Sequence, residues 1–219
     1  MWRYVLIISV VILAAGESTR FPGGKLLQKI VFKNTVKPLL RILVDKYILN
    51  KHVSEVVVVV GYRFDEIIRS LGNSNIKYVY NRMFSEGMSS SVKVGVSSVA
   101  KYSDIVFIHP GDVPFVKEET IGKLVSKSIE LYGHGRDFII IPRYRGKGGH
   151  PLVVSRKLIK HVLEIREEEQ GLKGFLRKYS SNQIYIDVDD PGVLYDIDTP
   201  EDLVRAEEMF KIKWVRQDP

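Results

Sequence analysis

A glycine, two cations and several carboxylates stand at intervals that suit the binding of a phosphate. Near the start of the chain an apolar run ends in Ala-Ala-Gly at Gly16, and Arg20 and Lys25 follow shortly after. Gly16 permits a positive φ and close approach of the backbone, Arg20 can hold two phosphate oxygens, and Lys25 supplies a point charge. We interpret this segment as a phosphate-binding loop; a plain turn with surface cations is the alternative. It is neither GxGxxG nor GxxxxGK[ST], which disfavours the dinucleotide-binding and P-loop classes.

Carboxylates form the second part of the pattern. Asp112, in the sequence HPGDVP, follows an apolar run, where a carboxylate is well placed to hold Mg²⁺ together with phosphate oxygens. The alternative is a turn in which Asp112 accepts local amides. Asp196 and Asp198 precede a helix start that Thr199 and Pro200 explain as a cap. On a strand these two carboxylates would point the same way, and a bound cation would relieve their repulsion.

A third polar group lies in the sequence NRMFSEGMSSSVKVG. Asn81 stands at the end of an expected strand, and three serines from Ser89 to Ser91 stand at an expected helix start. These groups can form hydrogen bonds to a base or a ribose. Helix capping is the alternative, and it accounts for one serine but not for three.

The elements that must position these residues alternate between strands and helices. We expect strands at residues 4–13, 55–61, 76–80, 104–108, 138–141, 151–154 and 183–187. We expect helices at residues 34–49, 64–70, 89–100, 117–132, 156–164, 171–178 and 200–211. This alternation predicts an α/β fold with a doubly wound, mainly parallel sheet and helices on both faces, in a single domain over residues 1–219. Ligands bind such sheets at the carboxyl ends of the strands, so the polar groups should converge on one edge.

Composition limits the possible partners. The chain has 219 residues, a net charge of +7 and no cysteine, so disulfides, thiolate metal sites and cysteine nucleophiles are excluded. The basic balance favours nucleotides, phosphorylated metabolites or nucleic acid.

The start of the chain, MWRYVLIISVVILAAG, could pass for a signal peptide. We favour a buried strand because the run is rich in β-branched residues and shorter than the ~20 residues that span a membrane. We therefore expect a cytoplasmic protein that binds neither membrane nor nucleic acid.

Taken in order, these segments resemble the molybdenum-cofactor cytidylyltransferase and guanylyltransferase family of the NTP-transferase group. The resemblance rests on LAAGESTRFPGGK, on Asn81 with GMSSSVKVG, on GDVP, on Gly149-His150-Pro151 and on DIDTPEDL. It spans nearly the whole chain, and its motifs are specific in combination. The first loop departs from the family pattern by an insertion between Arg20 and Lys25, which leaves open how close Lys25 comes to a phosphate.

The resemblance implies a Rossmann-like fold of the nucleotide-diphospho-sugar-transferase type and a Mg²⁺-dependent nucleotidyl transfer. A substrate phosphate attacks the α-phosphate of an NTP, and pyrophosphate leaves. Arg20, Lys25 and Asp112 take the catalytic roles. Asp112 and Asp198 bind the metal, and Asp196 is the alternative to Asp198 as the second ligand. The implied nucleotide-binding residues are Leu13, Ala14, Ala15, Gly16, Asn81, Ser91 and Gly111. His150 and Asp196 are implied at the acceptor.

The resemblance also bears on the substrates. Its guanine users tend to have LAGG, and the methyl group of Ala15 would narrow a purine site, so we expect CTP. The expected acceptor is molybdopterin or the molybdenum cofactor, and a molybdoenzyme or its chaperone is left open as a partner. The alternatives are a GTP-using guanylyltransferase, a nucleotidyltransferase for a sugar or polyol phosphate, and a basic non-catalytic nucleic-acid-binding protein. The last leaves Asp112 and Asp198 at the expected strand ends unexplained.

Overall fold

A computed structural model describes residues 5–21, 23–72 and 75–216. Its main sheet has the strand order β10-β7-β9-β6-β1-β4-β5, with β8 paired to β7. The strands are β1 (Ile8–Ala14), β4 (Glu55–Val60), β5 (Lys77–Tyr80), β6 (Ile105–Pro110), β7 (Ile139–Tyr144), β8 (Lys147–Gly148), β9 (Leu152–Ser155) and β10 (Gln183–Asp187). Only β8 and β9 run antiparallel to their neighbours among these strands. The predicted mainly parallel sheet is therefore confirmed.

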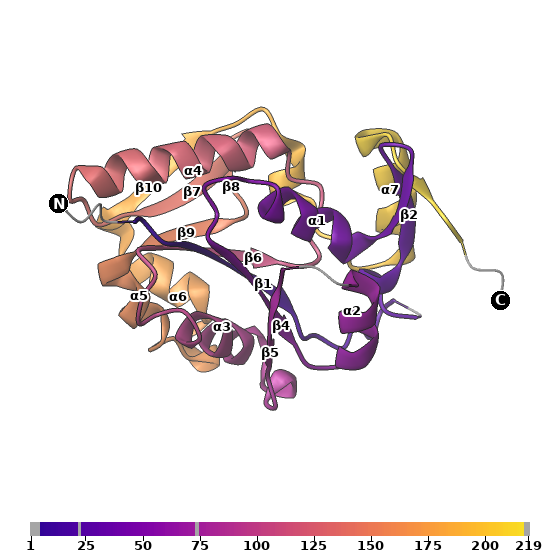
Figure 1. Ribbon diagram of the computed structural model, residues 1–219, viewed down its shortest axis with the longest axis horizontal. Helices are drawn as coiled ribbons and strands as arrows, with labels where there is room; N and C mark the ends of the chain where they lie inside the picture. The colour runs from indigo at the N-terminus through magenta and orange to yellow at the C-terminus, as the bar shows by residue number, and fades with distance from the viewer. Residues whose placement is uncertain (1–4, 22, 73–74, 217–219) are drawn as a thin grey trace.

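Helices cover both faces of this sheet (Figure 1). One face carries α1 (Leu39–Ile48), α2 (Phe64–Leu71) and α4 (Glu118–Gly133), and the other carries α3 (Met88–Ser97), α5 (Arg156–Val162) and α6 (Leu172–Lys178). Strand β1 shows why its sequence is apolar throughout. Val10 and Ile12 pack on the first face and Val11 and Leu13 on the second, because successive side chains point to opposite sides of a strand.

Short 3₁₀ helices occupy several of the connections. They are η1 (Lys25–Leu27), η2 (Phe84–Glu86), η3 (Glu167–Glu169), η4 (Ser180–Asn182) and η5 (Pro191–Leu194). Apart from the first predicted helix, the predicted strands and helices are present, with ends that differ by a few residues. The predicted start of the first strand, residue 4, lies outside the described residues. No helix in the described part of the chain is long and apolar enough to cross a membrane.

A second, antiparallel sheet was not predicted. It has the order β11-β2-β3, formed by β2 (Lys29–Phe32), β3 (Thr35–Pro38) and β11 (Lys213–Trp214). The helix predicted over 34–49 is therefore wrong at its start, and α1 begins only at Leu39. Lys33 and Asn34 form the turn of this hairpin, with φ values of 49° and 61° in the left-handed region that tight two-residue hairpin turns use.

A small apolar core joins this sheet to α7 (Pro200–Phe210). Three loops with predicted site residues each bury one side chain in it. Phe21 follows Arg20, Phe115 lies in the Asp112 loop, and Ile197 precedes Asp198. Phe21, Phe115 and Ile197 are 3%, 4% and 0% exposed. Because interiors pack densely, this core fixes the three loops relative to one another.

Candidate active site

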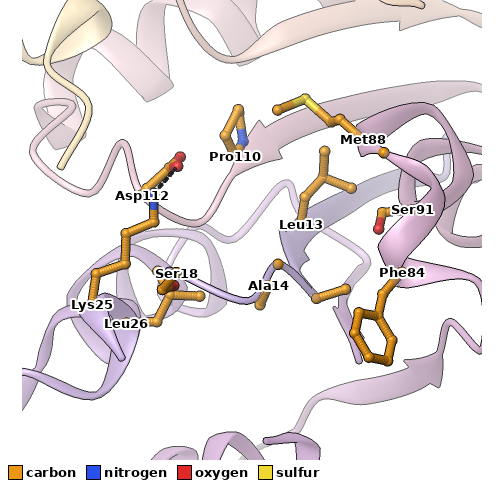
Figure 2. Close-up of a pocket in the computed structure, with 13 residues that line it drawn as sticks. Leu13, Ala14, Ser18, Lys25, Leu26, Phe84, Met88, Ser91, Pro110 and Asp112 are labelled. Atoms are coloured by element: carbon orange, nitrogen blue, oxygen red, sulfur yellow. Dashed lines mark hydrogen bonds and ion pairs between the residues drawn. The ribbon is translucent and has the colours of Figure 1, made fainter. Parts of the chain in front are cut away.

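A cavity of about 250 Å³ lies at the carboxyl end of β1 (Figure 2). It is lined by seven of the predicted site residues: Leu13, Ala14, Ala15, Gly16, Lys25, Ser91 and Asp112. They come from the β1 end, η1, α3 and the loop after β6. The expected convergence at the edge where parallel strands end is therefore present.

Backbone geometry in the opening loop differs from the prediction at Gly16. Gly16 does not use a positive φ; Ser18, with φ 54°, takes the left-handed conformation instead. A Cβ added at Gly16 would meet nothing within 4 Å. The glycine therefore leaves space at the cavity and does not serve to make a turn.

The insertion between Arg20 and Lys25 forms a tight turn that leaves Lys25 at the cavity. Phe21 donates its N–H to the Ser18 carbonyl at 2.8 Å, and Gly24 donates to the Phe21 carbonyl at 3.0 Å. Gly23 and Gly24 have φ values of 77° and 82°, which only glycine adopts easily. Pro22 lies outside the described residues. Phe21 is buried, and after this turn Lys25 lines the cavity.

Lys25 joins the two predicted metal-binding carboxylates. Its Nζ lies 2.7 Å from Asp112 Oδ2 and 2.9 Å from Asp198 Oδ1, and Arg20 pairs with the second oxygen of Asp198 at 2.8 Å. Burial alone would lower the pKa of Lys25, but Asp112 and Asp198 outweigh it and raise that pKa. The hydrogen bond from Lys25 lowers the pKa of Asp198, more than its burial raises it. The charged Lys25 ammonium and the ionised Asp198 carboxylate therefore stabilise one another.

The donor set of this cluster fits Mg²⁺. Two carboxylate oxygens already converge on one cationic group, the Lys25 ammonium. Across the described residues, no group of three or more His, Cys, Asp or Glu side chains could hold a metal. Two carboxylates suffice for Mg²⁺, which takes its other ligands from phosphates and water, but not for a structural zinc site.

Local hydrogen bonds explain how Asp198 reaches this point. Ile197 donates its N–H to the Asp112 carbonyl at 2.8 Å, which ties the two loops together. The Asp202 carboxylate accepts the N–H groups of Asp198 and Thr199 at 2.9 and 2.7 Å and completes a capping box at the start of α7, where a cap was predicted from Thr199 and Pro200. The two aspartates do not lie on a strand, contrary to expectation. Asp196 is exposed, and only Asp198 joins Lys25.

Asn81 lies behind the cavity, and its predicted contact with a nucleoside is not supported by its position. Its side chain is 1% exposed and donates to the hydroxyls of Ser90 and Ser91 at 2.9 and 3.0 Å, while its Oδ1 accepts the N–H of Met83. Asn81 therefore orients Ser91, which does line the cavity. A strand-end position predicted the place of Asn81 but not the direction of its side chain.

Gly111 also has a packing role here. It donates its N–H to the Leu13 carbonyl at 2.8 Å, and an added Cβ would lie 2.8 Å from that same oxygen. Glycine thus allows the Asp112 loop to approach the end of β1. Gly111 does not line the cavity itself.

The start of α3 is capped from outside the helix. Ser89 donates its N–H to Glu167 Oε2 at 2.9 Å, and Ser90 donates its hydroxyl to the carbonyls of Met83 and Gly87, so none of the serines caps the helix in the predicted way. Glu167 supplies the negative charge that a helix N-terminus favours. The expected base or ribose contact stays open only for Ser91.

A second cavity of about 720 Å³ adjoins the first, and Met88 lines both. His150 lines this larger cavity, together with Lys173, Glu167 and Tyr185, while Asp196 lines neither. Burial lowers the pKa of His150, and the nearby carboxylates of Asp112 and Asp196 partly offset that effect. Of the two residues predicted at the acceptor, only His150 faces a cavity.

Some residues that line the first cavity were not among the predicted site residues, and two of them have large apolar side chains. Phe84 and Met88 border the first cavity, and both lie within the segment already singled out for its serines (Figure 2). Apolar side chains beside polar ones were a usable signal, because small-molecule sites are lined mostly by apolar groups.

Comparison with known proteins first defines the class. The structure is similar to a solved nucleotidyl transferase from Methanothermobacter thermautotroptrophicus, with a TM-score of 0.75, 22% identity, and coverage of 94% of this chain and 98% of that one. The fold is that of the nucleotide-diphospho-sugar transferases. A model of the MobA-like NTP transferase domain matches residues 10–183, so the chain belongs to that family of nucleotidyltransferases.

Two curated relatives refine the picture. The chain is 26% identical over 208 residues to the molybdenum cofactor cytidylyltransferase of Escherichia coli (strain K12), which covers 93% of this chain and 97% of that protein. It is 33% identical over 120 residues to the bifunctional protein GlmU of Caldicellulosiruptor saccharolyticus. This match covers 55% of the chain and 25% of that protein. The resemblance expected from the motifs is therefore confirmed at the level of the family.

Proposed function

We propose that the protein transfers CMP from CTP to the phosphate group of a small-molecule acceptor, molybdopterin or the molybdenum cofactor, and that it requires Mg²⁺. One observation carries the proposal: Lys25 joins Asp112 and Asp198 beside the cavity that Leu13 and Gly16 line. That arrangement combines fixed positive charge with two hard oxygen ligands, as a triphosphate requires.

In the proposed reaction the acceptor phosphate oxygen forms a bond to the α-phosphorus of CTP. The bond from that phosphorus to the β-phosphate bridging oxygen breaks, and pyrophosphate leaves with its electrons. When bound to Asp112 and Asp198, Mg²⁺ supplies charge neutralisation for the phosphates. Lys25 and Arg20 add positive charge where the leaving group develops negative charge. No side chain acts as a nucleophile, so positioning and electrostatics supply the catalysis.

The division into two adjoining cavities supports a transfer between two substrates. The smaller one has the cations and carboxylates, and we assign it to the nucleotide. The larger one, with His150 and Lys173, is assigned to the acceptor. Met88 lines both cavities, so the two proposed substrates would lie next to one another there.

The preference for CTP rests on Ala15. Its side chain is 2% exposed at the cavity, and its Cβ and carbonyl lie so close to Gly61 that a Cβ there would come within 2.9 Å of both. Ala15 therefore cannot withdraw toward β4 to admit a larger base.

A cytoplasmic location is part of the proposal, because nucleoside triphosphates are kept in that compartment, and a molybdoenzyme or its chaperone is the proposed recipient of the product.

The test is an incubation with labelled CTP, Mg²⁺ and the molybdenum cofactor, followed by detection of pyrophosphate and of the dinucleotide form of the cofactor. Parallel reactions replace CTP with GTP and the acceptor with sugar or polyol phosphates. Turnover with GTP alone would reassign the base, and turnover only with a sugar or polyol phosphate would reassign the acceptor. No pyrophosphate in any combination would reject the proposed activity.

A further inference from the structure

Three buried polar side chains beneath the Asp112 loop have no part in the chemistry described above. Lys46 and Tyr47 are consecutive residues of α1, and His109 lies near the end of β6. Their exposed fractions are 7%, 0% and 0%. Polar groups in such positions destabilise a protein unless hydrogen bonds satisfy them, so their partners indicate their purpose.

Lys46 directs its ammonium at the backbone of the Asp112 loop. Its Nζ donates to the carbonyls of Pro114 and Val116, each at 2.7 Å. The ring of Phe32 lies under the same ammonium, 5.6 Å away. An apolar side chain could fill the same space, but it could not hold two carbonyl groups.

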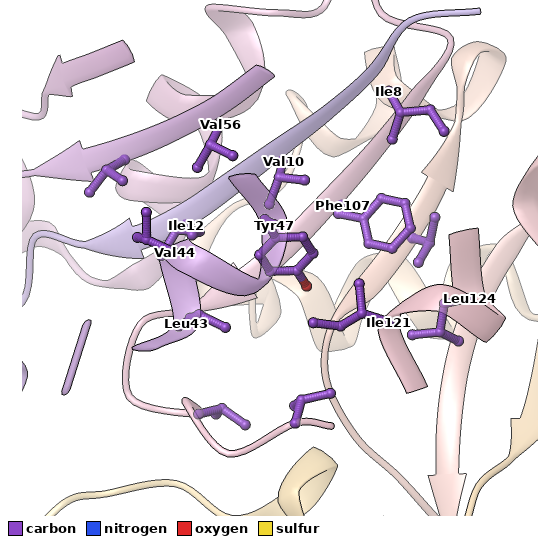
Figure 3. Packing of buried hydrophobic residues seen from close by; sticks show 14 of the residues in the cluster. Ile8, Val10, Ile12, Leu43, Val44, Tyr47, Val56, Phe107, Ile121 and Leu124 are labelled. Atoms are coloured by element: carbon purple, nitrogen blue, oxygen red, sulfur yellow. The ribbon is translucent and has the colours of Figure 1, made fainter. Parts of the chain in front are cut away.

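His109 holds a third carbonyl of this loop. Its Nε2 donates to Val113 O at 2.9 Å, because a carbonyl can only accept. Burial lowers the pKa of His109 well below its ordinary range, so the ring is neutral and Nδ1 bears no proton. The Tyr47 hydroxyl therefore donates to Nδ1, at 2.7 Å. Figure 3 shows the Tyr47 ring within the apolar cluster near Phe107, which leaves its hydroxyl as the polar end.

The three side chains together hold the chain just after Asp112. Val113, Pro114 and Val116 supply the carbonyls, and no regular strand or helix covers them, since β6 ends at Pro110 and α4 begins at Glu118. The loop therefore depends on side chains for its position, as a satisfied buried network specifies one arrangement.

We propose that Lys46, Tyr47 and His109 form a buried anchor that sets the position of the Asp112 carboxylate, and that they act as positioning residues for Mg²⁺ binding. Tyr47 acts through His109 by fixing which ring nitrogen carries the proton. The role in metal binding rests on the proposed function, whereas the anchoring of the loop does not.

The test compares His109→Leu with His109→Gln. The amide nitrogen of Gln can replace Nε2 as a donor to Val113, and Leu cannot. The first measurement is amide hydrogen exchange of residues 110–117 in protein free of metal and nucleotide. Loss of one such hydrogen bond should accelerate local opening about tenfold in the Leu variant, with Gln close to wild type. Lys46→Met and Tyr47→Phe should also accelerate exchange in this segment.

The control is Tyr78→Phe, which removes a buried hydroxyl that has no hydrogen-bond partner among the described residues. It should leave exchange of residues 110–117 unchanged. Wild-type exchange in this segment for both His109→Leu and Lys46→Met would overturn the anchor. Acceleration that is equal throughout the protein would overturn it too, because it would report global destabilisation alone.

The second measurement addresses metal binding. In His109→Leu the Mg²⁺ concentration for half-maximal pyrophosphate release should rise about tenfold, while the KM for CTP at saturating Mg²⁺ changes by less than about twofold. Equal changes in both would overturn the positioning role. If the wild type releases no pyrophosphate, the proposed function fails and the metal role with it, while hydrogen exchange still decides the anchor.

Discussion

The Lys25 ammonium lies 2.7 Å from Asp112 Oδ2, although 87 residues separate the two along the chain. The same ammonium reaches Asp198, so the opening loop, the loop after β6 and the segment before α7 meet at one charged group. Arg20 adds a second positive charge at Asp198. Two cations and two carboxylates balance here, and a cation that replaced Lys25 at the carboxylates would free its ammonium for a triphosphate. This exchange is the electrostatic reason to expect a divalent metal with the nucleotide.

The first prediction concerns Asp112. Asp112→Asn keeps the size of the side chain but removes the charge that a metal and Lys25 both contact. Nucleotidyl transfer should fall by on the order of 10²-fold or more, the loss seen when a single electrostatic group is removed from a site. Melting should stay within roughly 4 °C of wild type. Asp187→Asn, at the exposed pair with Arg143, is the matched control and should retain activity. Near-wild-type turnover by Asp112→Asn would exclude this carboxylate from the mechanism.

The second prediction concerns the packing of α3. A Cβ at Gly95 would lie 2.4 Å from Val11 Cγ1 and 2.6 Å from Val59 Cγ2, so Gly95→Ala must push α3 off the sheet at a cost of about 1–3 kcal/mol. Gly122 in α4 has nothing within 4 Å of such a Cβ, and Gly122→Ala should stabilise by up to about 1 kcal/mol through helix propensity. Urea unfolding of both variants measures the difference. A Gly95→Ala protein as stable as Gly122→Ala would contradict the close approach.

Much of the fold follows from local patterns. Buried runs such as Glu55–Val60 are apolar on both faces, so they predict strands between two layers of helices. Polar residues at the ends of such runs predict the site, because parallel strands end at one edge. Asp112 was located in this way.

Other features depend on contacts that no local pattern contains. Asn81 and Ser91 both stand at the ends of predicted elements, yet Asn81 is buried and donates to the hydroxyl of Ser91, which lines the cavity. Glu167 accepts the N–H of Ser89 at the start of α3, 78 residues away in the sequence. Lys46 donates to carbonyl groups 68 and 70 residues away. The hairpin of β2 and β3 was missed because each strand has only four residues, too few for a clear period.

The third prediction is a pH dependence from Lys46. Burial lowers its pKa from 10.5 to about 8, and the carboxylates of Asp190 and Glu118 offset only part of that effect. Between pH 8 and pH 10.5 the unfolded chain therefore binds more protons than the folded one, and the free energy of unfolding rises with pH. Denaturant unfolding of wild type and Lys46→Met below pH 8 and near pH 10.5 checks the sign. The advantage of the wild type over the variant should grow over this range; a shrinking advantage would show that the pKa of Lys46 is not lowered.

The last prediction concerns the small core beneath the site. Ile197 is fully buried between Asp196 and Asp198, and its N–H bonds to the Asp112 carbonyl. Ile197→Ala should cost about 2–5 kcal/mol and Ile197→Val about 0.5–1.5 kcal/mol, in proportion to the cavity left. Because we expect this side chain to set the distance between the carboxylates of Asp112 and Asp198, transfer activity should fall in the Ala variant even where the protein remains folded.

Val204→Ala is the matched control, because Val204 lies on α7 with 46% of its surface exposed. It should change stability by less than about 0.5 kcal/mol and leave activity unchanged. Activity is compared at a temperature where all three variants are folded by circular dichroism. If Ile197→Ala is destabilised yet fully active per folded molecule, then the small core stabilises α7 without positioning Asp198. If its activity falls while Ile197→Val stays close to wild type, the packing beneath Asp198 sets the geometry of the carboxylate pair.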